Sequence, residues 1–225
     1  MKNDHLEVSR LRADLLDAIE PHVPFDGWSE PAFKAAIADL EIDPALARLA
    51  CPRGAVDLAV EYHRAADRQL AEALAAADFE GMRFRDKVAA AVRMRFDLVD
   101  RDLVSRGASI FALPQNAATG AKLVWDTADL IWRALGDTSE DYNWYTKRLT
   151  LSGVISSTTL FWIGDDSEDH AESWAFLDHR IENVLAFDKV KSGLMKVPGL
   201  KGVLENLRPP CRMAAPGHMP QKEAV

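Results

Sequence analysis

Residues 143–162 read NWYTKRLTLSGVISSTTLFW and combine side chains that could hold an amphiphile. The aromatic pair Trp144 and Tyr145 precedes two cations, Lys147 and Arg148, and the rest of the stretch carries no charge. The planar fork of an Arg side chain matches a phosphate or carboxylate group, and Lys adds a point charge. We therefore predict that Arg148 and Lys147 contact an anionic lipid headgroup at the mouth of an apolar tunnel.

The uncharged part of this stretch is interrupted by small and hydroxyl-bearing residues. As a helix it is roughly 24 Å long, too short to span a bilayer, so we expect an interior helix of a bundle. Two interpretations stay open: the small residues let neighbouring helices pack closely, or they leave room for a long apolar ligand. In the second interpretation, the lining side chains are Leu151, Ile155, Thr159 and Trp162.

The neighbouring aromatics Trp144 and Tyr145 are candidates for a contact surface. Exposed Trp and Tyr side chains are enriched where a protein meets a partner or a membrane interface. We predict a partner surface here, with a buried Trp144 as the alternative.

Catalytic and metal-binding motifs are missing from the sequence. No two of the six histidines lie four residues apart on a predicted helix, and no Gly-rich phosphate loop or G-x-S-x-G motif occurs. The acidic run 165–170 precedes a helix, where carboxylates favour the helix dipole. Cys51 and Cys211 form no CxxC pair, which indicates a reducing compartment. We predict no catalytic residue, no metal, no cofactor and no enzyme activity.

Every periodic segment of the chain is helical, so the predicted fold class is all-α. We expect an N-terminal helix-turn-helix-like part over residues 1–53, followed by a ligand-binding and dimerisation bundle over 54–191. An amphipathic segment over 192–208 and a disordered tail over 209–225 complete the chain. The expected helices are 6–20, 30–40 (with Ser29 as N-cap), 44–50, 54–77, 82–106 (stopped by Gly107), 117–135, 143–163 and 172–187.

The N-terminal part has the layout of a DNA reader but not its side chains. The segment in the recognition position, Pro44–Ala50, contains one Arg and no other cation or amide side chain. Residues 1–81 hold 8 Lys/Arg against 16 Asp/Glu, and this region carries the whole net charge of −8. Because phosphate contacts supply most of the affinity for DNA, we predict no nucleic-acid partner.

The C-terminal segment carries an apolar face flanked by cations, typical of a helix lying in a membrane interface. The alternative is a helix that docks back on the bundle. The predicted membrane-facing residues are Leu200, Val203, Leu204, Leu207, Lys196 and Lys201.

A family resemblance covers residues 141–184, DYNWYTKRLTLSGVISSTTLFWIGDDSEDHAESWAFLDHRIENV. This segment resembles the signature region of the ubiquinone-biosynthesis accessory family, the ninth Coq protein. The pattern is N-W-Y-[ST]-[KR]-R, then a small-residue helix, then W-x-F-L-x-x-R-[IV]. A weaker, collinear likeness extends over residues 11–77.

The resemblance implies the fold of TetR-type regulators, with a helix-turn-helix that no longer serves DNA. It implies a homodimer whose pocket binds phospholipid or an isoprenoid quinone intermediate, and a final helix that associates with the membrane surface. It also implies that the protein presents substrate to the demethoxyubiquinone hydroxylase. In this family the hydroxylase surface corresponds to Trp144 and Tyr145, and the headgroup arginine corresponds to Arg148.

The start of the chain suggests where the protein works. Met1–Arg12 is polar and charged, and no mitochondrial presequence precedes residue 11. We therefore expect a cytoplasmic protein peripherally associated with the inner membrane of a bacterium. The alternative function is a TetR-like, ligand-sensing transcriptional regulator.

Overall fold

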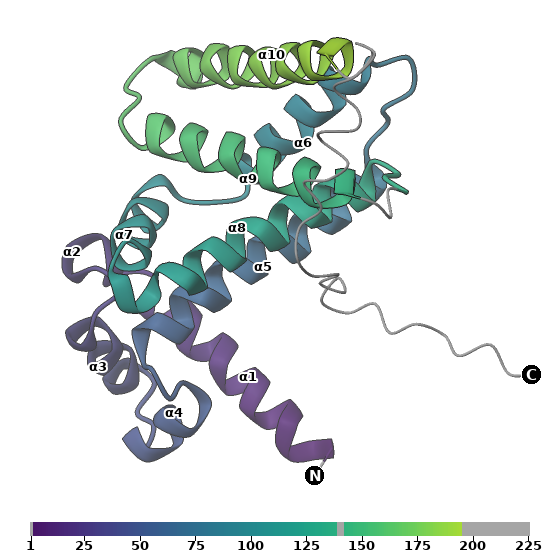
Figure 1. The fold of residues 1–225 in the computed structure, drawn as a ribbon. Coiled ribbons are helices and arrows are strands. Elements are labelled where there is room, and N and C mark those ends of the chain that lie inside the picture. The colour runs from purple at the N-terminus through teal and green to yellow at the C-terminus, as the bar shows by residue number, and fades with distance from the viewer. Residues whose placement is uncertain (1, 139–141, 195–225) are drawn as a thin grey trace, which may run out of the picture. The chain divides into compact units, whose positions relative to one another are not determined.

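The computed structural model describes residues 2–138 and 142–194, with side-chain surroundings for residues 7–138 and 144–184. Over these residues every regular element is a helix (Figure 1). The elements are α1 (Lys2–Ile19), α2 (Val23–Asp26), α3 (Glu30–Asp39), α4 (Pro44–Ala50), α5 (Ala55–Ala76), α6 (Phe84–Asp97), α7 (Arg101–Phe111), α8 (Pro114–Ala134), α9 (Tyr142–Ile163), the 3-10 turn η1 (Glu168–His170) and α10 (Ala171–Leu194).

Local signals in the sequence place the short N-terminal helices. The hydroxyl of Ser29 accepts a hydrogen bond from the backbone N–H of Ala32 at 3.4 Å, so the predicted N-cap of α3 is confirmed. Asp43 caps α4 in the same way, with its carboxylate 2.8 Å from the backbone nitrogen of Ala45. These caps satisfy backbone donors that a helix start otherwise leaves unpaired.

The apolar faces of the N-terminal helices share one core with the start of α5 and with α7. Leu15, Ile19 and Phe33 are fully buried in it, and Leu103 of α7 packs against them. The indole nitrogen of Trp28 donates a hydrogen bond to the carbonyl of Leu103 at 3.1 Å. The helix-turn-helix-like part therefore joins the bundle through a buried contact.

Three long helices, α5, α8 and α9, form the centre of the bundle, and α8 lies along both of the others (Figure 1). Each presents a buried stripe at helical spacing. On α9 the stripe is Leu151, Ile155, Thr158 and Trp162, so the face toward the bundle mixes apolar side chains with one hydroxyl.

The single helix predicted over 82–106 is wrong, because the chain breaks there into α6 and α7. Asp100 causes the break: its carboxylate accepts the backbone N–H groups of Asp102 and Leu103, at 2.8 and 3.1 Å, and so caps a new helix. The predicted stop at Gly107 is also wrong, since α7 continues through it to Phe111. The hydrophobic periodicity continues across the break, so the sequence pattern does not reveal where α6 ends and α7 begins.

The acidic run before α10 behaves as the helix N-terminal charge cluster expected from the sequence. The carboxylate of Asp165 accepts the backbone N–H groups of Ser167 and Ser173, each at 2.9 Å, and the hydroxyl of Ser173. These hydrogen bonds from Ser167 and Ser173 hold the pKa of Asp165 well below its usual range. Asp165 therefore fixes the entry into α10.

Residues Met1–Glu182 form one compact unit, and Asn183–Val225 form a second. The predicted boundary at residue 53 falls inside the first unit. Residues 195–225 lie outside the described residues, and with them most of the predicted amphipathic segment 192–208, the predicted tail and the predicted membrane-facing Leu200, Val203, Leu204, Leu207, Lys196 and Lys201.

Candidate functional site

A cavity of about 340 Å³ lies among α5, α6, α7, α8 and α9. Its inner end is formed by buried or half-buried side chains such as Trp28 and Leu103, and exposed Ser156 and Leu160 of α9 mark its mouth. Apolar side chains make up most of the wall: Ala59, Phe96, Val99, Leu103, Val104, Phe111, Leu123, Val124 and Ile155. The volume is at the lower end of the range of about 300–1,000 Å³ for ligand pockets, so the cavity suits a small apolar molecule or part of a longer one.

Small residues let α7 and α8 approach each other beside the cavity. Gly107, Ala108 and Ala112 line it from α7 and its end, and Gly120 and Ala121 line it from α8. At Gly120 an added Cβ would lie 2.7 Å from the Cβ of Phe111, closer than real Cβ contacts allow. Glycine at position 120 therefore sets the position of Phe111 in the cavity wall.

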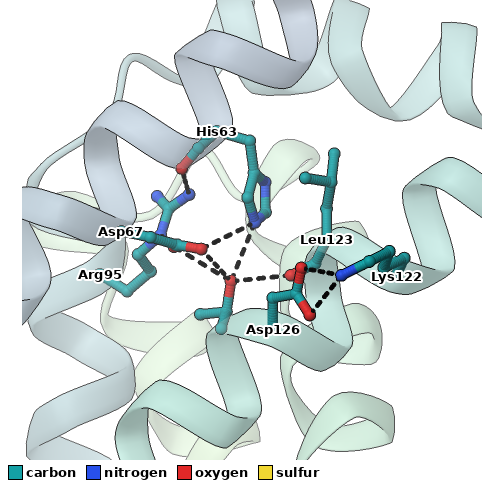
Figure 2. A network of polar contacts seen from close by, with 7 residues as sticks. His63, Asp67, Arg95, Lys122, Leu123 and Asp126 are labelled. Carbon is teal, nitrogen blue, oxygen red and sulfur yellow. Dashed lines mark hydrogen bonds and ion pairs between the residues drawn. The ribbon is translucent and has the colours of Figure 1, made fainter. Parts of the chain in front are cut away.

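His63, Arg95 and Thr127 line one part of this cavity and form a polar cluster with Asp67. Figure 2 shows His63, Asp67 and Arg95 within this network of polar contacts. The guanidinium Nε of Arg95 donates to Asp67 at 2.8 Å, with both side chains largely buried. The hydroxyl of Thr127 lies 3.0 Å from both carboxylate oxygens of Asp67 and 2.9 Å from Nε2 of His63. Three helices, α5, α6 and α8, thus meet in one hydrogen-bonded group.

Burial keeps His63 neutral at physiological pH. Removal of water from around the imidazolium lowers the pKa of His63 to about 4, although the nearby Asp67 carboxylate acts in the opposite direction. Because Asp67 and Arg95 balance each other, the polar cluster carries no net charge at pH 7. Burial also raises the pKa of the Tyr62 hydroxyl, which lines the same cavity and stays protonated.

The predicted positive gate is not at this cavity, because Arg148 is buried elsewhere. Its side chain is 1% exposed and lies between two carboxylates, with Nε 2.5 Å from Asp129 and Nη1 3.0 Å from Asp137. The guanidinium also stacks over the ring of Trp144, 4.0 Å from its centroid. Lys147 pairs with the same Asp137 at 2.7 Å. Because a buried charge needs a partner of opposite charge, these ion pairs give Arg148 and Lys147 a structural role. Neither side chain lines the cavity.

The aromatic pair stays half-exposed at the start of α9. The rings of Trp144 and Tyr145 meet edge to face with centroids 4.8 Å apart, and Trp125 of α8 packs against both. Since Trp144 covers the buried Arg148, the ion-pair group fixes the ring in place. The structure therefore presents a rigid aromatic patch at this end of α9.

The structure divides the predicted pocket-lining residues into two groups. Ile155 and Thr159 line the cavity. Leu151 and Trp162 are buried but face other neighbours, and Trp162 packs edge-on against Phe96 with centroids 5.0 Å apart. These four positions share one face of α9 but lie at different heights along it, so a set chosen from sequence spacing alone extends past both ends of the cavity wall.

In the described part of the chain, no group of His, Cys, Asp and Glu side chains could hold a metal ion. Within the same residues, no helix is long and apolar enough to cross a membrane.

Comparison with known proteins identifies the chain's relatives. Residues 117–188, covering α8, α9 and much of α10, match the model of the COQ9 family. The chain is 29% identical over 219 residues to the mitochondrial ubiquinone biosynthesis protein COQ9-A of Xenopus laevis, covering 88% of this chain and 67% of that protein. It is 29% identical over 192 residues to COQ9 of Drosophila melanogaster, covering 83% and 59%.

The predicted resemblance to the COQ9 family is thus confirmed. The rat COQ9 protein is 36% identical to the chain over 129 residues, which cover 55% of this chain and 41% of that protein. The chain spans about 59 to 67% of the length of the fly and frog relatives.

A solved structure bears on the fold of this chain. A TetR transcriptional regulator from Nitrosomonas europaea superposes with a TM-score of 0.63 at 17% identity, covering 77% of this chain and 97% of that one. The predicted all-α, TetR-like fold is thus confirmed.

Sequence reasoning missed the polar cluster and the contribution of α7 to the cavity. A usable signal was present: His63 and Asp67 lie four residues apart on a helix that otherwise buries Ala, Val and Leu. Polar residues on the buried stripe of an amphipathic helix need partners in the interior. The identity of those partners, Arg95 and Thr127, depends on how three helices pack.

Proposed function

We propose that this protein is a non-enzymatic, lipid-binding accessory protein of ubiquinone biosynthesis. It binds phospholipid or isoprenoid quinone intermediates and presents them to the demethoxyubiquinone hydroxylase at a membrane. The observation that carries the proposal is the apolar cavity with its small-residue mouth between α7, α8 and α9. The similarity to proteins named for ubiquinone biosynthesis supports the choice of a lipid from that pathway.

Blocking the mouth of the cavity tests lipid binding. Ala121 is exposed and lines the cavity, so Ala121→Trp should fill the entrance without disturbing buried packing. The matched control is Ala117→Trp, one turn earlier on α8, exposed and outside the cavity wall. Mass spectrometry of organic extracts should find co-purified lipid in the wild type and the control but much less in Ala121→Trp. A wild-type extract without lipid would contradict the proposal.

The aromatic patch supports the proposed contact with the hydroxylase. Trp and Tyr are favoured at the centres of protein interfaces because they bury large areas at small entropic cost. Trp144→Ala and Tyr145→Ala should weaken co-precipitation of the hydroxylase, whereas Phe25→Ala, at an exposed aromatic on α2, should not. Equal co-precipitation by all variants would remove Trp144 and Tyr145 from the interface.

The proposed homodimer would use an uncharged face of α9. Leu149 is 66% exposed, and Gly153 follows it one turn later with open space around it. A Leu149→Glu substitution should shift the protein toward monomer in sedimentation experiments, because the charge would be buried in the contact. An unchanged mass would place the contact elsewhere.

The membrane surface remains part of the proposal. Its predicted contact residues lie beyond residue 194, and deletion of residues 189–225 should reduce co-sedimentation with anionic but not neutral liposomes. The relatives are named as mitochondrial proteins, so they give no support to the bacterial location predicted from the sequence.

The TetR-like fold keeps a ligand-sensing regulator as a second candidate. The surface of α4 argues against it: Leu46 and Leu49 are exposed there, and Arg48 pairs with Glu30 and stacks over Phe33. A recognition helix needs free donors for bases and phosphates. Gel shifts with genomic fragments should show no retardation, and a specific shift would favour the regulator.

A further inference from the structure

The polar cluster lies in the cavity wall, where a purely apolar ligand would give its side chains no role in binding. His63, Arg95 and Thr127 reach the cavity from α5, α6 and α8, on a wall that is otherwise mostly apolar. A ligand without polar atoms would remove from water every donor or acceptor that the cluster does not pair internally. A few converging polar groups in an apolar pocket are the usual means of fixing a ligand's orientation.

The charges of the cluster select against an anionic group. Asp67 and Arg95 are paired at 2.8 Å with side chains 14% and 10% exposed, so the guanidinium charge is already matched. A phosphate or carboxylate placed here would face the Asp67 carboxylate and a neutral imidazole. An uncharged polar group meets no such opposition.

The hydrogen bonds of Thr127 fix which nitrogen of His63 carries the proton. The Thr127 hydroxyl lies 3.0 Å from both oxygens of Asp67 and 3.1 Å from the carbonyl of Leu123, and all three are acceptors. Its single proton goes to the charged Asp67 carboxylate, the strongest acceptor nearby, so its oxygen accepts the Nε2–H of His63 at 2.9 Å. In a neutral ring this leaves the lone pair on Nδ1, which makes Nδ1 a hydrogen-bond acceptor.

We infer that the cavity takes an uncharged amphiphile whose hydroxyl-bearing end lies at the polar cluster, with the hydroxyl donating to Nδ1 of His63. The apolar chain then runs toward Ser156 and Leu160 at the mouth. Phenols, quinols and long-chain alcohols share this chemistry. The inference rests on the proposed function and adds the class and direction of the ligand.

Two probes of matched size test the inference on the full chain. The first, 4-heptylphenol, carries the hydroxyl, and the second, heptylbenzene, lacks it. One added hydrogen bond should make the wild type bind the phenol roughly 3- to 10-fold more tightly. His63→Phe should abolish that preference while keeping affinity for heptylbenzene. Thr159→Val, which removes a hydroxyl of the cavity wall outside the cluster, should keep the preference.

A measurement on the wild type avoids dependence on the folding of His63→Phe. In ¹⁵N spectra of the histidine rings, the His63 Nδ1 signal should move on addition of 4-heptylphenol and stay in place with heptylbenzene. Equal affinity for both probes with an unmoved signal would overturn the inference and leave lipid binding intact. Failure of the wild type to bind either probe would overturn both this inference and the proposed function.

Discussion

Replacing Arg148 with Met should show that the ion pairs of Arg148 with Asp129 and Asp137 stabilise the fold. The substitution keeps most of the side-chain volume but removes the buried cation between two carboxylates, 9% and 3% exposed. Asp129 then keeps the exposed Arg133 as an ion-pair partner, and Asp137 keeps Lys147. Breaking a buried ion pair by removing one partner costs about 3–5 kcal/mol of unfolding free energy. The lost stacking with Trp144 adds to that cost.

Thermal unfolding followed by circular dichroism measures this effect. At about 2–4 °C per kcal/mol for a chain of this size, Arg148→Met should lower the melting temperature by roughly 6–20 °C. The matched control is Arg133→Met, because Arg133 pairs with the same Asp129 but is 73% exposed. An exposed pair contributes about 0–1 kcal/mol, so the control should melt within a few degrees of the wild type.

The headgroup interpretation makes the opposite prediction. If Arg148 served only to bind lipid, Arg148→Met would lose lipid and keep its melting temperature. A melting temperature equal to that of Arg133→Met would therefore refute the structural argument. Adding Asp129→Asn and Asp137→Asn to Arg148→Met should restore part of the stability, because the amides remove the buried carboxylate charges.

Four further substitutions test other parts of the structure. Gly120→Ala should lower the free energy of unfolding by about 1–3 kcal/mol, because the added methyl group would push on Phe111. Gly153→Ala faces open space on α9 and should raise the free energy of unfolding by up to about 1 kcal/mol. Urea titrations measure both changes. Asp100→Ala should cost about 1 kcal/mol in the same assay through loss of the α7 cap. His63 titrates near pH 4 when folded and near 6.5 when unfolded, so the unfolded chain binds more protons between these values and stability falls as the pH drops from 6.5 to 4. His63→Gln should remove up to about 3 kcal/mol of that pH dependence, and an unchanged pH profile would contradict the neutral, buried His63.

Helix placement could be predicted from sequence wherever a cap or a proline marked the end. Ser29 announces α3, and Pro44 and Ala50 bound α4 as predicted. The break at Asp100 could not be found from periodicity, because α6 and α7 continue one hydrophobic register while changing direction. The carboxylate of Asp100, which accepts two backbone N–H groups, starts the second helix there.

The site was only partly predictable, because charge and burial are set by distant partners. The sequence shows Arg148 beside aromatic residues but not that Asp129 and Asp137 surround it, 19 and 11 residues away. From the sequence, Arg148 next to an apolar helix predicts a contact with a ligand. In the structure its counter-charges are instead two carboxylates of the same chain. Conversely, Ile155 and Thr159 line the cavity, but the α7 wall opposite them follows from close contact between Gly120 and Phe111.

The Trp28–Leu103 hydrogen bond gives the N-terminal helices a part in building the cavity. Trp28 belongs to the segment between α2 and α3, yet its ring closes the far end of the chamber built by the long helices. In a protein that starts at residue 54, the loss of Trp28 would open this end of the cavity to water. The N-terminal helices therefore contribute to closing the inner end of the cavity.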